Sequence, residues 1–499
     1  MDLNELLEKQ KIYNNPDTKI DLIYGGGFSI RDYYMESGNP QLMRGASELL
    51  NAAPKTACKE IEALKHGAYF SCGSETFFIV AHGKGAEAAS SFERSYTKST
   101  VSAQSVAVSI PSTIGQIMHK DGFKENWKEL MSAYDSRRML VYFEMDSQTG
   151  YERCTRCNFR NPIETIPELD LHLCKTCFKK YEEGKKNRNI YQKRCIRYGI
   201  VEKIILQEAS RDYLGAKTVE DLSDKNGDVA LLYADINNLG GAGLVLEGNA
   251  CRRKEFTEAV STSVQHALYT AILKGLSISE NHHFEIVAVG GDDICILIPG
   301  EIGLIVGTLL LEHFDKEWAK NGQGFTELSI SAGIAVGNSI TPLLYMRDAA
   351  EQLVKIAKKK AHKTKNSCLD ILSLNNDGQW ATRIENKLRN GLIHYESGEK
   401  ANRTMRPLTA REAREMLNFL DESRKNTSAS TLHKIADASM KLGVVEGDLW
   451  FDYLVSKQQD DGLISLARLI NANNSMYFQT DEGLYSAWHD LAELSNQLS

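Results

Sequence analysis

The sequence predicts an α+β fold with two ferredoxin-like domains, a four-cysteine insert between them and a C-terminal helical bundle. Two observations support this prediction. The order strand, helix, strand, strand, helix, strand occurs twice, first within residues 20–110 and again within residues 229–337, and two Cys-x-x-Cys pairs lie between the copies. A chain of 499 residues is also too long for a single hydrophobic core, so several domains are expected.

The first copy begins with the apolar strand IDLIYG and continues with a helical stretch, a hairpin, a second helical stretch and an alternating strand. The expected ranges are 20–25, 42–65, 68–81, 84–98 and 101–110. Gly25 stands where Asp235 stands in the second copy, and a serine and a glutamate at 74–75 replace the aspartates at 292–293. We therefore expect the first copy to be degenerate and to lack a metal site.

The insert between the copies carries the pattern Cys154-x-x-Cys157, sixteen residues, then Cys174-x-x-Cys177. Thiolates at this spacing form two short loops that meet on one tetrahedral zinc ion. A set of four cysteines leaves no coordination position for water, so the predicted zinc is structural rather than catalytic. The other six of the ten cysteines are scattered, which favours a reducing compartment over a disulfide framework.

The second copy begins with the apolar strand VALLYAD, which ends in an acid, and the hairpin FEIVAV-GGDD-ICILIP follows a helical stretch. The expected ranges are 229–235, 251–274, 284–299, 301–320, 328–337 and 342–360. This order of elements is the plan of the ferredoxin-like, or palm, domain.

The last quarter of the chain reads as helical to its end, with helices expected at 408–424, 429–442, 446–457, 461–472 and 481–497. We expect four domains, namely a degenerate first palm at 1–145, a zinc insert and linker at 146–200, a catalytic palm at 201–375 and a helical domain at 376–499.

The acids of the second copy are the strongest functional signal. Asp235 ends one strand, and Asp292 and Asp293 lie at the turn of the hairpin beside it. Hard divalent cations prefer carboxylate oxygens, and phosphoryl transfer by two metal ions needs several carboxylates that converge. We predict that these three residues are catalytic and that, with Ile236, they bind two Mg or Mn ions. The alternative is an ordinary hairpin turn, where Gly and Asp are common.

Residues around the acids are candidates for nucleotide binding. Two glycines before the acids let the backbone pass close to a base or a triphosphate. Asn237 and Asn238 follow the first acid, where they contact ribose or phosphate or cap a helix. The lysine-rich end of the helix at 342–360 holds a triphosphate or is a solvated helix face. The candidate nucleotide-binding residues are Gly290, Gly291, Asn238, Lys355, Lys358 and Lys359.

Composition limits the class of protein. The formal net charge is −7, so a general basic field cannot explain binding to nucleic acid. No apolar run approaches the length of a membrane span, and the polar N-terminal residues MDLNELLEKQ do not form a signal peptide. We expect a cytoplasmic protein with no membrane partner.

Taken together, the degenerate palm, the zinc insert, the GGDD palm and the helical end resemble the large polymerase-cyclase subunit of type III CRISPR effector complexes. The resemblance covers essentially the whole chain and is most specific in LLYADINNLG, VGGDDICILIPG and SAGIAVG with the lysine-rich helix. It implies an antiviral-defence enzyme that joins ATP into cyclic oligoadenylate when target RNA pairs with guide RNA. It also implies the metal role of the three acids, the zinc role of the four cysteines, and RNA and other subunits of the complex as partners.

One feature departs from this family. Many members begin with a His-Asp nuclease domain, but here only about twenty residues precede the first strand, and the His489-Asp490 dipeptide lies in the last expected helix, where we expect a surface position. The resemblance is therefore to a shortened form that lacks this domain. Two other functions remain open. GGDD with SAGIAVG also resembles diguanylate-cyclase palms, which ATP and GTP turnover would distinguish, and a scaffold subunit could bind nucleotide without turnover.

Overall fold

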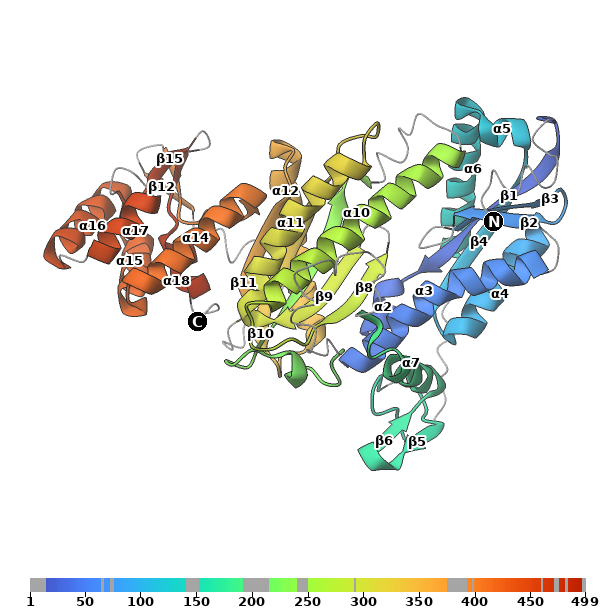
Figure 1. The fold of residues 1–499 in the computed structure, drawn as a ribbon, viewed down its shortest axis with the longest axis horizontal. Helices are drawn as coiled ribbons and strands as arrows, with labels where there is room; N and C mark the ends of the chain where they lie inside the picture. The colour runs from blue at the N-terminus through green and yellow to red at the C-terminus, as the bar shows by residue number, and fades with distance from the viewer. Residues whose placement is uncertain are drawn as a thin grey trace.

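The computed structural model describes residues 15–63, 67–71, 76–140, 152–158, 160–191, 215–239, 250–290, 293–374, 393–396, 399–458, 461–470, 475–480 and 483–495. The elements follow one another along the length of the molecule, with the N-terminal sheet at one end and the C-terminal helices at the other (Figure 1). A small cysteine-bearing region projects from the side of this row. None of the described helices has the length and apolar character needed to cross a membrane.

The first palm contains a four-stranded antiparallel sheet. In sheet order its strands are β2 (Gly67–Ser71), β3 (Thr76–Ala81), β1 (Lys19–Phe28) and β4 (Gln104–Thr113). Its helices are α2 (Ile30–Met35), α3 (Pro40–Ala63), α4 (Gly85–Thr100), α5 (Ile114–Met118) and α6 (Lys120–Met139). Helices α3 and α4 cover one face of the sheet, and α5 and α6, which the sequence patterns did not predict, cover the other.

The second palm contains a six-stranded sheet. In sheet order its strands are β14 (Leu408–Thr409), β11 (Cys368–Ser373), β10 (Ser329–Asn338), β7 (Asp228–Asn237), β9 (Asp293–Pro299) and β8 (Glu285–Gly290). Its helices are α10 (Ala250–Leu276), α11 (Gly303–Asn321) and α12 (Leu343–Thr364). The order β8-β9-β7-β10 repeats the order β2-β3-β1-β4 of the first palm, so the predicted fold class of two ferredoxin-like palms is confirmed.

Alternation of side chains along β7 gives the second sheet two different faces. The even-numbered residues, such as Leu232, pack with α10 and α11 in a cluster that extends into the C-terminal helices. Val229, Leu231 and Tyr233 lie on the other face, in a cluster shared with α12 and with α2, α3 and α4 of the first palm. The palms therefore share a hydrophobic core, in which each fully buried large side chain contributes about 1.5–3 kcal/mol.

The cysteine module consists of the four cysteines with β5 (Glu164–Ile166), β6 (Leu171–Leu173) and α7 (Lys175–Lys186). Helix α7 crosses α3 at unusually short distance, because both helices have a glycine at the crossing. A Cβ atom on Gly45 would lie 1.8 Å from the Lys180 carbonyl oxygen, and one on Gly184 would lie 1.9 Å from the Gln41 carbonyl oxygen. The module is thus seated directly on the first palm.

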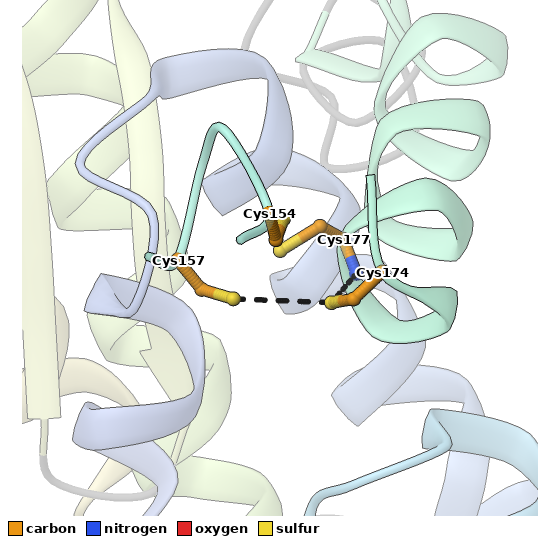
Figure 2. A group of neighbouring side chains, drawn as sticks. All are labelled: Cys154, Cys157, Cys174 and Cys177. Carbon is orange, nitrogen blue, oxygen red and sulfur yellow. Dashed lines mark hydrogen bonds between the residues drawn. The ribbon is translucent and has the colours of Figure 1, made fainter. Parts of the chain in front are cut away.

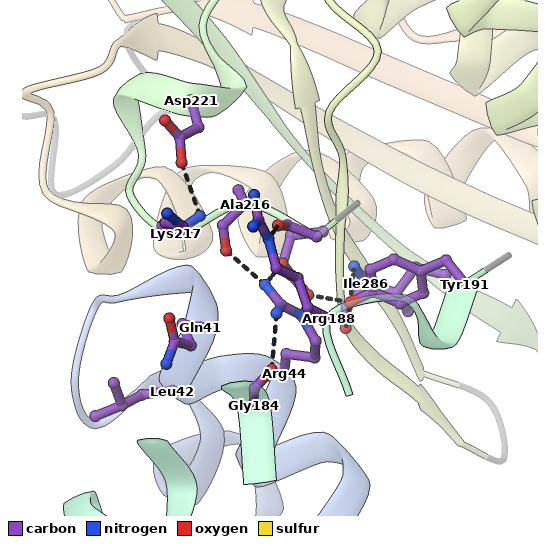
Figure 3. Close-up of polar contacts among 12 residues, drawn as sticks. Gln41, Leu42, Arg44, Gly184, Arg188, Tyr191, Ala216, Lys217, Asp221 and Ile286 are labelled. Atoms are coloured by element: carbon purple, nitrogen blue, oxygen red, sulfur yellow. Dashed lines mark hydrogen bonds and ion pairs between the residues drawn. The ribbon is translucent and has the colours of Figure 1, made fainter. Parts of the chain in front are cut away.

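A buried arginine joins three parts of the chain (Figure 3). Arg44 of α3 donates to Glu285, at the start of β8, over 2.7 Å from Nη2 to Oε2 and 3.1 Å from Nε to Oε1. It also donates to the carbonyl oxygens of Gly184 (2.9 Å) and Ala216 (2.5 Å). Arg44 is 1% exposed and Glu285 0%, and such a buried charge is tolerated only when it is fully paired. This network fixes the strand that leads to the GGDD turn against the first palm.

The C-terminal region is helical, as predicted, but it also contains strands. Its helices are α14 (Ala410–Asn426), α15 (Ala429–Lys441), α16 (Val444–Gln458), α17 (Asp461–Ile470) and α18 (Trp488–Ser495). A small sheet has the order β12 (Ile393–Glu396), β13 (Glu399–Asn402), β16 (Gly483–Tyr485) and β15 (Phe478–Thr480). The helix expected over 481–497 is therefore wrong in its first part, because residues 483–485 form β16, which pairs with β15 just before it and with β13 earlier in the chain.

The expectation that the His489-Asp490 dipeptide lies on a helix surface is also wrong for the aspartate. Asp490 is 0% exposed, and it accepts hydrogen bonds from the Thr404 hydroxyl (2.7 Å) and the Met405 amide (2.7 Å). The Arg406 guanidinium is 2.8 Å away. These contacts use the carboxylate to hold α18 in place, which is a structural role.

Candidate active site and metal centre

Asp235 and Asp293 lie side by side in the second sheet. Asp235 is near the end of β7, Asp293 is the first residue of β9, and the two are directly paired across the strands. Both side chains therefore project from the same face of the sheet, the face that is turned toward α12 and the first palm. Gly290 ends β8 and pairs with Asp293, while Gly291 and Asp292 lie outside the described residues.

Lys358 of α12 pairs with the first acid. Its Nζ is 2.7 Å from Oδ2 of Asp235. Burial raises the pKa of the Asp235 carboxyl, and the neighbouring Lys358 ammonium opposes that rise. The sequence predicted this lysine as a contact to triphosphate, and in the structure it pairs with Asp235.

The second acid is held by a residue of the first palm. Arg31, in the first turn of α2, donates from Nη2 to Oδ1 of Asp293 (2.9 Å) and from Nε to Oδ2 (3.3 Å). This two-point contact is the strong geometry of an arginine–carboxylate pair. The Tyr233 hydroxyl donates to the same Oδ1 over 2.5 Å. Burial and the adjacent Asp293 charge raise the pKa of Tyr233, so the hydroxyl stays protonated and remains a donor.

Sequence patterns missed Arg31 and Tyr233. Arg31 is separated from Asp293 by 262 positions, and no local pattern marks it. Tyr233 did carry a signal, because it lies two residues before Asp235 in a strand and must therefore point to the same face.

The remaining candidates for nucleotide binding have different surroundings. Asn238 is exposed just after β7, with a φ of 62°. The Asn237 side chain is buried and bonds to the hydroxyls of Ser329 and Ser331, each over 2.9 Å, so it joins β7 to β10. The Ile236 side chain is in the core, which leaves only its backbone carbonyl for a metal. Lys355 and Lys359 are exposed on α12.

Gly25 in the first palm does not face the same way as Asp235 in the second. A Cβ atom on Gly25 would lie 3.1 Å from the Phe92 ring of α4, so Gly25 faces the helices that cover the first sheet. Asp235 faces away from the corresponding helices, α10 and α11. The residues of β1 on the matching face are its two neighbours, Tyr24 and Gly26, because side chains alternate along a strand. Neither position carries an acid, and Ser74 and Glu75 lie outside the described residues.

The donor atoms around the acids fit a divalent cation. Asp235 and Asp293 bring two carboxylates from adjacent strands to one place, and hard ions such as Mg and Mn prefer these ligands. A lysine and an arginine compensate this charge in the structure. The site therefore already binds positive charge at both carboxylates.

The four cysteines form a buried group (Figure 2). Their sulfur atoms all lie within 4.8 Å of one another, and Cys157 and Cys174 are 3.9 Å apart. A tetrahedral zinc site with Zn–S bonds of about 2.3 Å requires sulfur atoms about 3.8 Å apart. The Cys177 amide also donates to the Cys174 sulfur over 3.4 Å, which favours a thiolate. The group therefore fits one structural zinc ion.

Comparison with known proteins identifies the second palm. Residues 228–369 match the family model described as Cas10/Cmr2, second palm domain. A search of curated proteins found no match.

Solved structures match over most of the chain. A Csm1–Csm4 cassette in complex with pppApA is 11% identical, with 99% of this chain and 71% of that chain covered and a TM-score of 0.57. The cassette in complex with cA4 is 10% identical, with 97% and 70% covered and a TM-score of 0.55. Csm1 in T. onnurineus is 12% identical, with 88% and 64% covered and a TM-score of 0.55. These proteins share the fold, and the match of residues 228–369 to the Cas10/Cmr2 model confirms the predicted family resemblance.

Proposed function

We propose that this protein, whose second palm matches the Cas10/Cmr2 model, is a nucleotidyltransferase that joins ATP into cyclic oligoadenylate. The observation that carries the proposal is the pairing of Asp235 with Asp293 on the face of the second sheet that meets the first palm. The matched cassette structures contain pppApA and cA4, which are a linear and a cyclic product of this chemistry. We assign the protein to an RNA-guided antiviral complex, with guide RNA, target RNA and a Csm4-like subunit as partners.

In the reaction, the 3′-hydroxyl oxygen of one ATP forms a bond to the α-phosphorus of another. The bond from that phosphorus to the bridging oxygen breaks, pyrophosphate leaves, and the hydroxyl proton passes to solvent. Asp235, Asp292 and Asp293, with the backbone carbonyl of Ile236, would hold two Mg or Mn ions. When bound, these ions supply Lewis-acid activation of the attacking and leaving oxygens.

The chain's own residues position the nucleotides and balance their charge. Gly290 and Gly291 leave room for a base or triphosphate beside the acids. Lys358 is within reach of Asp235 and Arg31 within reach of Asp293, so a triphosphate at the acids would meet a cation from each palm. Lys355 lies one turn before Lys358 on α12 and extends this cationic row, with Lys359 beside it.

The activity is tested by incubating the purified protein with ATP or GTP and Mg or Mn, and identifying products by mass spectrometry. The reaction is run alone and with guide RNA, target RNA and partner subunits. We expect cyclic oligoadenylate from ATP, and no product from a variant with Asp292→Ala and Asp293→Ala that retains its fold. Wild-type turnover by this double variant would end the proposal. Cyclic product from GTP alone would favour the diguanylate-cyclase alternative, and binding of ATP without any product would favour a scaffold.

A further inference from the structure

We propose that helix α2 is a positioning element that links the cysteine module to the acids of the second palm. Its first turn holds Asp293 through Arg31, and the residue that follows its last turn, Glu36, is held by the cysteine module. The part of this proposal that concerns turnover rests on the proposed function. The part that concerns metal affinity at Asp293 does not, because metal binding is measured without catalysis.

The contact at Glu36 is buried and made twice. Lys180 Nζ is 2.6 Å from Glu36 Oε2, and Arg160 Nη1 pairs with Oε1. Lys180 also donates to the Tyr33 carbonyl oxygen over 2.5 Å and lies over the Tyr33 ring, 3.8 Å from its centroid. The Lys180 side chain is 1% exposed and the Glu36 side chain 7%. Removing one partner from such a pair leaves a buried charge uncompensated, so the contact constrains the end of α2 strongly.

Both cations come directly from the zinc-binding loops. Arg160 follows Cys157 by three residues, and Lys180 follows Cys177 by three residues. Each of the two Cys-x-x-Cys pairs therefore places one cation on Glu36. A zinc ion that fixes the two loops relative to each other would also fix both cations, and with them the end of α2.

Helix α2 depends on such external contacts. It has six residues, and no side chain caps its N-terminus, where Ser29 has a φ of 50°. A helix this short is not stable by itself. One side packs into the shared core through Tyr33, Tyr34 and Met35. Another side borders a cleft of about 570 Å³, whose lining includes Asp32, Glu36, Cys157, Arg160 and Arg347. The ion pairs at Glu36 therefore hold the end of α2 on the side that borders the cleft, where the hydrophobic core does not reach.

The position of α2 determines where the Arg31 guanidinium lies. If the end at Glu36 is released, Arg31 no longer holds Asp293 in a fixed geometry. Two effects follow. Asp293 becomes more available to a divalent ion, since a competing cation is removed, and turnover falls, since the cation from the first palm is misplaced.

The test compares Glu36→Gln with Glu93→Gln. Glu93 is the matched control, because it pairs with Arg137 over 2.7 Å within the same palm and touches neither α2 nor the cysteine module. Mn²⁺ affinity is measured without nucleotide by titration calorimetry, and product formation is measured separately. Mn²⁺ prefers oxygen ligands, so the cysteines do not compete for it.

We expect Arg31→Ala and Glu36→Gln both to tighten Mn²⁺ binding while lowering turnover, each by on the order of threefold to thirtyfold. The double variant should resemble Arg31→Ala, because Glu36 acts through Arg31. Glu93→Gln should match the wild type. Purely structural damage would weaken Mn²⁺ binding instead, and weaker binding would overturn the proposal. Unchanged Mn²⁺ binding in Glu36→Gln would also overturn it, as would additive effects in the double variant.

If Glu36→Gln fails to fold, a double variant that carries Glu36→Gln and Lys180→Met takes its place in the same comparison. This variant removes the two most buried charges of the contact together and leaves the less buried Arg160. The Mn²⁺ measurement does not require catalysis. A wild type that makes no product would therefore contradict the proposed function and leave this link to be decided by binding, whereas product formation without the binding effect would contradict only the link.

Discussion

Asp235 and Asp293 of the second palm each lie beside one cation, and the two cations come from different parts of the chain. Lys358 comes from α12 of the same palm, whereas Arg31 comes from α2 of the first palm. A triphosphate brings several negative charges to such a site, and fixed cations stabilise charge without reorganising during the reaction. The ion pair with Asp235 makes Lys358 a more specific candidate than a lysine-rich helix end alone suggests.

Lys358→Ala should lower product formation by about tenfold or more, because it removes a fixed cation beside Asp235. Lys363→Ala is the matched control, since this lysine is exposed on the last turn of the same helix. Initial rates and KM for ATP are compared under identical metal concentrations. Equal rates for the two variants would show that Lys358 has no part in the reaction.

At the scale of elements, the crossing of α3 and α7 holds the cysteine module on the first palm. The crossing depends on two glycines and on helix α7, whose N-terminus is capped by Cys174. A mutation in either feature therefore affects the module before it affects the palms.

Gly45→Ala should destabilise the protein by about 1–3 kcal/mol, because the added Cβ would meet the Lys180 backbone oxygen in a packed interface. Gly447→Ala in α16 is the control. There the nearest atom is the flexible sulfur of Met476, 3.2 Å away, and alanine is the better helix former. Chemical denaturation followed by circular dichroism measures both, and a Gly45→Ala variant as stable as Gly447→Ala would contradict the close crossing.

Replacing Cys154 and Cys157 by serine should remove one zinc ion per chain, because two of the four thiolates are lost. Elemental analysis of the purified protein measures zinc, and limited proteolysis measures loosening of the module. The matched substitution is Cys58→Ser, at a buried cysteine outside the group, which should leave the zinc content unchanged. Absence of zinc from the wild type would disprove the predicted metal centre.

At the scale of the whole molecule, the C-terminal helices are not a separate body. They share one hydrophobic cluster with the second palm, and strand β14 joins the sheet of that palm. Arg406 reinforces the junction, because it donates to the Ile371 carbonyl oxygen (2.6 Å) and pairs with Glu493 (2.6 Å). The predicted boundary at residue 375 therefore does not separate two independent cores.

The Arg406–Glu493 pair should make this junction sensitive to acid. Burial alone would raise the pKa of Glu493, but the adjacent Arg406 guanidinium outweighs burial and lowers it below its ordinary value. The folded state therefore binds fewer protons than the unfolded state, so the stabilisation is complete above the ordinary glutamate pKa of about 4.3 and is lost as pH falls through the lower folded value.

Glu493→Gln should cost about 2–3 kcal/mol near pH 7 and progressively less as pH falls below about 4.3, where the unfolded chain binds the proton before the folded protein does. Urea unfolding at several pH values measures the difference. Glu446→Gln, at an exposed position in the first turn of α16, is the control and should change the free energy of unfolding by no more than about 0.5 kcal/mol. A constant difference between wild type and Glu493→Gln across this range would contradict the shift.

The sequence by itself determined the two palms, the order of their elements and the position of the cysteine group. These features depend on patterns within a short stretch of chain, namely strand alternation, helical spacing and paired Cys-x-x-Cys motifs. The duplicated order also indicated that the first palm is degenerate, although Gly25 faces the helices of its own palm, whereas Asp235 faces away from α10 and α11.

Only the tertiary structure decided what surrounds the acids. Arg31 meets Asp293, Lys358 meets Asp235, and Leu484 and Tyr485 pair with β13 as well as with the neighbouring strand β15. The first two contacts and the pairing with β13 join residues far apart in the chain, so they depend on how the palms and helices pack rather than on any local preference. Side-chain charge and strand propensity specify what a residue can bind, and packing specifies which partner it meets.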